Sequence, residues 1–146
     1  MDDSQFRSDI EDWILNYLSE CTPEHNDLPR CPFAKKSLLA RKIVFEAVND
    51  ESEAYNMVEE YLQIWNDDKH DAIVIHLDWP ISDHNRIRIV EISNSYYGKD
   101  NDFIFVEERQ TLANGTYDIV IMHRYSEMKV AQRQLKKAGY YPSNFA

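Results

Sequence analysis

The chain has 146 residues, of which 43% are hydrophobic, so its length and composition predict one folded domain over residues 1–146 and argue against wholesale disorder. Its 26 acidic residues outnumber its 16 basic residues, and the net charge of −10 argues against a general binder of nucleic acid or anionic membranes. With three glycines and no GxGxxG, Walker or GxSxG motif, the sequence also argues against the common nucleotide-binding and acyl-transfer enzymes.

The N-terminus and the hydropathy of the chain predict a cytoplasmic protein. The acidic N-terminal segment lacks the apolar core of a signal peptide, and no apolar run approaches the roughly 18 residues of a membrane-spanning helix. Cys21 and Cys31 are then expected to be reduced thiols, and a disulfide between them is the alternative in an oxidising compartment.

Hydrophobic spacing in the first half of the chain predicts three helices and two strands. A continuous apolar run over Ala72 to Ile75 is typical of a strand buried on both faces. Proline is favoured in the first turn of a helix, because its missing N–H has no partner there anyway. The expected elements are helices over about Ser4 to Ser19, from Pro32 onwards and over about Ser52 to Asn66, and strands over Ile43 to Val48 and Asp71 to Trp79.

The stretch from Pro80 to Tyr97 is ambiguous. Ser82 and Asp83 are suited to cap a helix, whereas the β-branched side chains within Arg86 to Ile92 favour a strand. We expect a helix over residues 82–97 and keep a strand as the alternative.

The last third of the chain predicts a β-hairpin followed by a helix. Asn114-Gly115 is a strong turn signal between two apolar segments. The expected elements are strands over Asp102 to Glu107 and Tyr117 to Arg124, and a helix that Ser126 caps and Gly139 ends.

The order of these elements predicts an α/β or α+β fold with a mixed β-sheet of about four strands packed against helices. Strands joined through a helix are expected to pair in parallel, and strands joined by a short turn are expected to pair antiparallel. A ferredoxin-like arrangement is the alternative.

Cys31 is the first candidate for chemistry. It lies beside the start of the predicted second helix, where the helix dipole and free backbone N–H groups lower the pKa of a thiol. His25, in the preceding loop, is then a candidate base, so the two residues predict a nucleophilic or redox centre. The alternatives are that Cys31 is a small buried apolar residue or a metal ligand.

The segment around this cysteine also carries a resemblance to known proteins. Trp13 in the N-terminal helix, followed by Cys-Pro-Phe-Ala and two lysines over Cys31 to Lys36, resembles small uncharacterised proteins of bacteria and bacteriophages. The likeness covers about the first quarter of the chain. The bacterial proteins tend to have His and Pro residues after a later apolar strand, whereas here Phe103 to Val106 is followed by two glutamates. The resemblance implies no activity and only a role for Cys31 in the fold.

His76 and Asp78 form a second candidate site. They lie two residues apart in a predicted strand and therefore point to the same face. His123 in the last strand reaches that face if the two strands are neighbours. These residues, with Cys31, are a ligand set suited to Zn²⁺ or Fe²⁺. The alternative is that His76 and Asp78 are a partly buried polar pair beneath a helix.

Basic residues are gathered in two short stretches of this acidic chain. Arg30 to Lys42 and Arg124 to Lys137 each carry five of them. The interpretations are solvated cations on the outer faces of helices, or an anion site where the two stretches meet.

Aromatic residues are frequent in the second half of the chain, either as packing residues or as a contact surface. They include Trp79, Tyr96, Tyr97, Tyr140, Tyr141 and Phe145. The acidity, the absence of catalytic motifs and these aromatics predict a small accessory or regulatory protein, of a phage-like kind, that acts through contacts with a protein partner. A small enzyme or a redox or metal protein is the alternative, using Cys31 with His25 or with His76, Asp78 and His123. The oligomeric state is left open.

Overall fold

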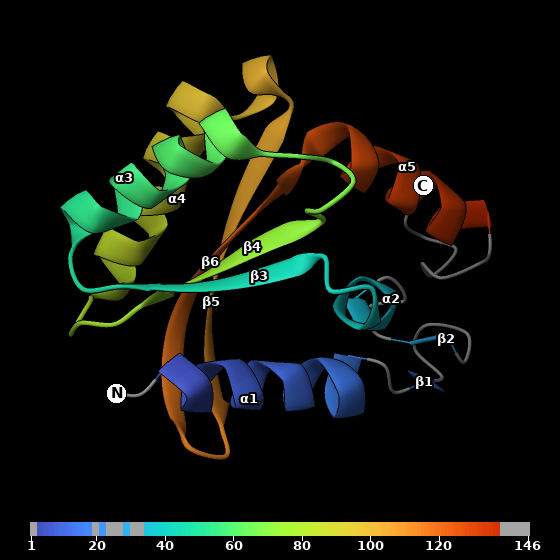
Figure 1. Ribbon diagram of the computed structural model, residues 1–146, viewed down its shortest axis with the longest axis horizontal. Helices are drawn as coiled ribbons and strands as arrows, with labels where there is room; N and C mark the ends of the chain where they lie inside the picture. The colour runs from blue at the N-terminus through green and yellow to red at the C-terminus, as the bar shows by residue number, and fades with distance from the viewer. Residues whose placement is uncertain (1–2, 19–20, 23–27, 30–33, 138–146) are drawn as a thin grey trace.

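The computed structural model describes residues 3–18, 21–22, 28–29 and 34–137. Figure 1 shows a central β-sheet with helices α3 and α4 on one face, helix α1 on the other face, and helices α2 and α5 towards one end. The expected mixed sheet packed against helices is confirmed, as an α+β fold.

The helices are α1 (Asp3–Trp13), α2 (Ala34–Leu39), α3 (Glu51–Ile64), α4 (Asp83–Tyr97) and α5 (Tyr125–Lys137), with a π-helical segment over Ile14–Leu18 after α1 and a 3₁₀ turn over Lys99–Asn101. The strands of the central sheet are β3 (Ile43–Val48), β4 (Ala72–Leu77), β5 (Phe103–Leu112) and β6 (Gly115–Arg124). Two further short strands, β1 (Cys21–Thr22) and β2 (Leu28–Pro29), pair with each other.

The strands of the central sheet lie in the order β3-β4-β6-β5. β3 and β4, which α3 connects, are parallel, and β5 and β6, which a short turn connects, are antiparallel, as expected. β6 also pairs with β4, in the antiparallel direction. The ferredoxin-like alternative is not formed, because α4 separates the second and third strands and no described strand follows α5.

The ambiguous stretch is helix α4. Ser82 caps it, since the side-chain oxygen accepts a 3.1 Å hydrogen bond from the Asn85 backbone N–H. The buried positions of the helix are Arg86, Ile89 and Ser93, which follow helical spacing. Two of the three are polar, so the hydrophobic pattern of a buried helix face was weak in the sequence.

The hairpin between β5 and β6 is longer than expected and turns one residue earlier. Leu112 pairs with Gly115, so Ala113 and Asn114 form the connection and Gly115 already belongs to β6. Asn114 is held by Asp9 of α1, which accepts hydrogen bonds from its backbone N–H at 2.9 Å and its side-chain Nδ2 at 2.7 Å. A contact with a distant helix therefore contributes to fixing this turn.

Two hydrophobic cores lie on the two faces of the sheet. On one face, α3 and α4 bury a cluster that includes Val58, Ile75, Ile89 and Phe105. On the other face, α1 and the π-helical segment that follows it pack Phe6, Ile10 and Ile14 against β4 and β6. The spacing of four residues between these side chains places them on one side of the helical segment. In the described part of the chain, no helix is both long and apolar enough to cross a membrane.

Candidate functional site

An open groove lies on the outer side of the α3–α4 layer. Its volume is about 390 Å³. The residues that line it come from both helices: Glu51, Tyr55, Arg88, Ile92, Tyr96 and Tyr97. On α4 the lining positions 88, 92 and 96 are four residues apart, so they form one stripe along the helix. The groove is therefore a surface feature between two helices, with one row of side chains from each helix along its walls.

An ion pair lies in the wall of this groove. The Arg88 Nη2 donates to both carboxylate oxygens of Glu51, each at 3.0 Å. The Tyr55 hydroxyl lies 3.4 Å from the same carboxylate, and burial together with the charge of Glu51 raises the pKa of Tyr55. Because Arg88 is bound to Glu51, the cation of the groove is already neutralised by the chain itself.

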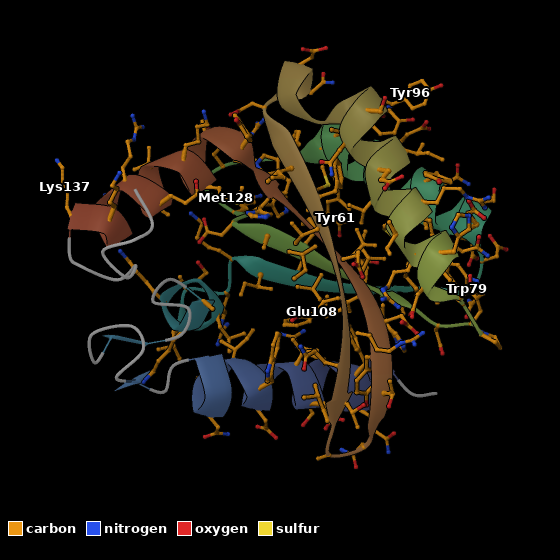
Figure 2. The ribbon with its side chains drawn as sticks, turned by 180° about the vertical axis from the view of Figure 1, so that it is seen from behind. Tyr61, Trp79, Tyr96, Glu108, Met128 and Lys137 are labelled. Carbon is orange, nitrogen blue, oxygen red and sulfur yellow. The ribbon has the colours of Figure 1, made fainter. Side chains whose placement is uncertain are left out.

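Tyr96 and Tyr97 form an aromatic pair in the groove. The ring centroids are 6.2 Å apart. The Tyr97 hydroxyl donates a hydrogen bond to Glu59 of α3, and this bond, aided by burial, raises the pKa of Tyr97. Tyr96 is 73% exposed, and Figure 2 shows its side chain on the outer side of α4. The groove thus combines a tyrosine that Glu59 holds in place, Tyr97, with an accessible tyrosine, Tyr96.

The sequence indicated only part of this surface. Tyr96 and Tyr97 belonged to the set of aromatics expected either to pack or to form a contact surface, and the groove includes them. Trp79 of the same set packs against the core, while residues 140–145 lie outside the described residues. The charged pair of Glu51 and Arg88 was missed, since its two members are 37 residues apart.

The candidate residues His76 and Asp78 lie close together. The His76 Nε2 is 4.0 Å from the Asp78 Oδ1, and the His76 side chain is buried. Its ring stacks on Phe6 of α1, with centroids 4.6 Å apart and an interplanar angle of 20°. Tyr117 meets the same ring edge-on at 5.2 Å. His76 is therefore part of the packing between α1 and the sheet.

His123 lies on the same face of the sheet as His76, but farther along it. His76 is opposite Ile119 on β6, and His123 is opposite Ala72. Four residues along a strand correspond to about 13 Å. Burial lowers the pKa of His123, so its imidazole is held in the neutral form. The two histidines share a face without sharing a site.

Among the described residues, no group of three or more His, Cys, Asp or Glu side chains is placed to hold a metal ion. Cys31 and His25 lie outside the described residues, so the expected nucleophilic, redox or metal centre built on them stays a prediction.

The two basic stretches approach each other through Lys42 and Arg124, but carboxylates lie between them. Lys42 pairs with Asp71 at 3.2 Å, and Arg124 pairs with Asp67 at 3.0 Å. Burial and the charges of these two aspartates raise the pKa of nearby Glu127. The cations at this meeting point therefore neutralise the chain's own carboxylates.

A second charged cluster lies between α4 and the sheet. The buried Arg86 pairs with three carboxylates: Glu107 through Nε, Asp83 at 2.9 Å and Asp118 at 2.7 Å. These partners offset the cost of burying the guanidinium and raise its pKa. The Nε and Nη1 atoms of Arg86 thus donate to carboxylates of the chain itself. Because Glu107 and Asp118 belong to β5 and β6, the cluster joins α4 to the hairpin.

Comparison of the chain with protein-family models, with curated proteins and with solved structures finds no match.

Proposed function

We propose that the protein is a cytoplasmic accessory protein that acts by binding a protein partner through the α3–α4 groove. The observation that carries the proposal is the open groove with Tyr96 at its surface. A tyrosine offers a large apolar ring and a hydroxyl, and it loses little conformational entropy when it is covered, which is why tyrosine is enriched in protein interfaces.

The other polar clusters of the described residues support this choice of surface. Asp9 and Arg86 are buried and bonded to side chains of neighbouring elements, and His76 is packed between aromatic rings. These groups stabilise contacts between elements of the fold. The groove differs from them because its aromatic face is turned to solvent.

Site-specific photo-crosslinking tests the proposal. A benzophenone amino acid is placed at position 96 and, as a matched control, at position 87 of the same helix. Ile87 is also exposed, but it does not line the groove. Nine residues at about 100° each place the two positions on opposite sides of α4.

In an extract of the cells that produce the protein naturally, we expect a distinct crosslinked protein from position 96 and none from position 87. The same crosslinks from both positions, or none from position 96, would refute the groove as a contact surface.

A further inference from the structure

We infer that the occupant of the α3–α4 groove is a cationic segment of the partner, with an arginine stacked on Tyr96 and paired with Glu59. This inference rests on the proposed function, and it adds the chemical class of the partner. It follows from the charge of the helical layer, from the position of the aromatic rings, and from the placement of the described cations of the chain.

The helical layer around the groove has an excess of carboxylates. Helix α3 contains four acidic residues and no basic residue, and α4 contains two of each kind. Both arginines of α4 are already bound within the chain, Arg86 in the buried cluster and Arg88 to Glu51. Among the described side chains of the layer, those of Glu53, Glu59, Glu60 and Glu91 have no cationic partner. The layer therefore offers carboxylates that the described cations of the chain do not neutralise.

Glu59 is the carboxylate best placed to bind such a ligand. Its Oε1 accepts the hydrogen bond from the Tyr97 hydroxyl, which leaves the second oxygen of the carboxylate for another donor. The hydrogen bond also fixes the carboxylate beside Tyr97, which lines the groove. A carboxylate that is already positioned loses less entropy when a cation binds to it.

The aromatic pair favours arginine over other cations. A guanidinium within about 6 Å of a ring centroid is attracted to the face of the ring, and its planar shape allows it to stack. The chain uses this geometry itself, since the Arg124 guanidinium lies 4.3 Å from the ring centroid of Phe103. Tyr96, which is mostly exposed, presents its ring to solvent and leaves it accessible to an incoming guanidinium.

The basic residues of α5, as far as the structure describes them, are not placed to fill the groove. Helix α5 carries exposed basic residues, but Figure 2 places Lys137 at the opposite end of the molecule from Tyr96. A second copy of the chain has the same net charge of −10, so the two copies repel each other. A basic segment of a different protein is attracted by the same charge.

Titration with defined peptides tests the inference. The probes are a short peptide of alternating arginine, serine and alanine, and two peptides of the same length in which every arginine is replaced by glutamine or by glutamate. Binding to the full chain is followed by isothermal titration calorimetry and by amide NMR shifts. We expect the arginine peptide to bind with shifts centred on residues 55, 92 and 96, and its affinity to fall as salt is added.

Three variants locate the binding. Tyr96→Ser removes the exposed ring, and we expect it to weaken the arginine peptide about three- to tenfold, the range of an exposed to partly desolvated cation–π contact. Glu59→Gln keeps an acceptor for Tyr97 but removes the charge, and we expect a similar loss. Ile87→Ser, on the opposite side of α4, is the control and is expected to bind like the wild type.

Equal weakening by Tyr96→Ser and Ile87→Ser, or equal binding of the arginine and glutamine peptides, would overturn the inference. Preferential binding of the glutamine peptide in the groove would do so as well, while leaving the groove as a protein-binding surface. Self-association that Tyr96→Ser abolishes would overturn it in favour of a second copy. The proposed function itself is tested separately, by the crosslinking experiment at position 96.

Discussion

The Tyr117 hydroxyl of β6 donates a 2.7 Å hydrogen bond to the Asp9 carboxylate of α1, across 108 residues of sequence. Both side chains are buried, with exposed fractions of 0% and 3%. Asn114 in the hairpin connection donates two more bonds to the same carboxylate. Asp9 therefore fastens the N-terminal helix to the hairpin.

Asp9 gives the protein a stability that depends on pH. Burial acts to raise the pKa of this carboxyl, but the hydrogen bonds from Tyr117 and Asn114 outweigh it and hold the pKa below the ordinary value of 3.8. A lowered pKa in the folded state contributes stability above the unfolded pKa, and this stability is lost as the pH falls through the folded value. We expect Asp9→Asn to lower the free energy of unfolding at pH 7 by about 1–3 kcal/mol.

Urea unfolding of the wild type and of Asp9→Asn, at neutral pH and below pH 4, measures this effect. The difference between the two proteins should shrink at acid pH, because the wild-type carboxylate becomes protonated. At the alkaline end, burial and Asp9 raise the pKa of Tyr117 to about 12, and Asp9→Asn should lower it. A constant difference across the acid range would contradict the role assigned to Asp9.

Replacement of Arg86 should cost far more stability than replacement of Arg109. Both arginines bind Asp83 and Asp118, but the Arg86 side chain is 8% exposed and the Arg109 side chain is 40% exposed. Arg86→Met leaves carboxylates without their buried cation, so we expect a loss of about 3 kcal/mol. Arg109→Met should cost much less, since solvent screens its pairs. Chemical unfolding compares them, and equal losses would mean that burial does not set the strength of the cluster.

Asn94 should protect the outer edge of the sheet. Its side-chain amide donates to the Phe105 carbonyl and accepts from the Phe105 N–H, both at 2.9 Å, so it takes the place of a neighbouring strand. Asn94→Asp replaces the donor by an oxygen that faces the carbonyl oxygen. We expect a loss of about 1–3 kcal/mol and faster hydrogen exchange of the Phe105 amide. Unchanged exchange at Phe105 would show that this amide is protected by other means.

Ser93→Ala is expected to stabilise the protein. The Ser93 hydroxyl is buried, and within the described residues it has no hydrogen-bond partner. The substitution removes a buried polar group that lacks a hydrogen bond. Alanine also has a higher helix propensity than serine at this position of α4. We expect a gain of about 1 kcal/mol in the free energy of unfolding. Thermal unfolding beside Ser95→Ala, an exposed position of the same helix, separates the two causes, and an equal gain in both variants would leave burial without an effect.

The metal hypothesis is tested by elemental analysis of the protein as purified. If Cys31 is a ligand of Zn²⁺ or Fe²⁺, we expect stoichiometric metal in the wild type and its loss in Cys31→Ser. His76→Gln serves as a separate variant, because His76 is packed on Phe6 and lies far along the sheet from His123. The absence of metal from the wild type would remove the metal-centre alternative and leave the thiol alternative for Cys31.

The sequence alone determined most of the local structure of this protein. The strand over Ile43 to Val48 has the bounds that its apolar run predicted, and the Ser82 cap favoured a helix for the ambiguous stretch that follows it. These features depend on interactions within a few residues along the chain, such as capping hydrogen bonds and side-chain spacing, and such interactions are encoded locally.

Only the tertiary structure decided which distant residues meet. His76 and His123 could be assigned to one face, but the pairing register separates them by four residues. The bond between Asp9 and Tyr117, and the groove between α3 and α4, join residues tens of positions apart. Their positions depend on strand order and on the packing of helices against the sheet. Strand order and helix packing are set by the burial of apolar surface from the whole chain. The hydrophobic effect is non-directional, so it does not specify which residue meets which.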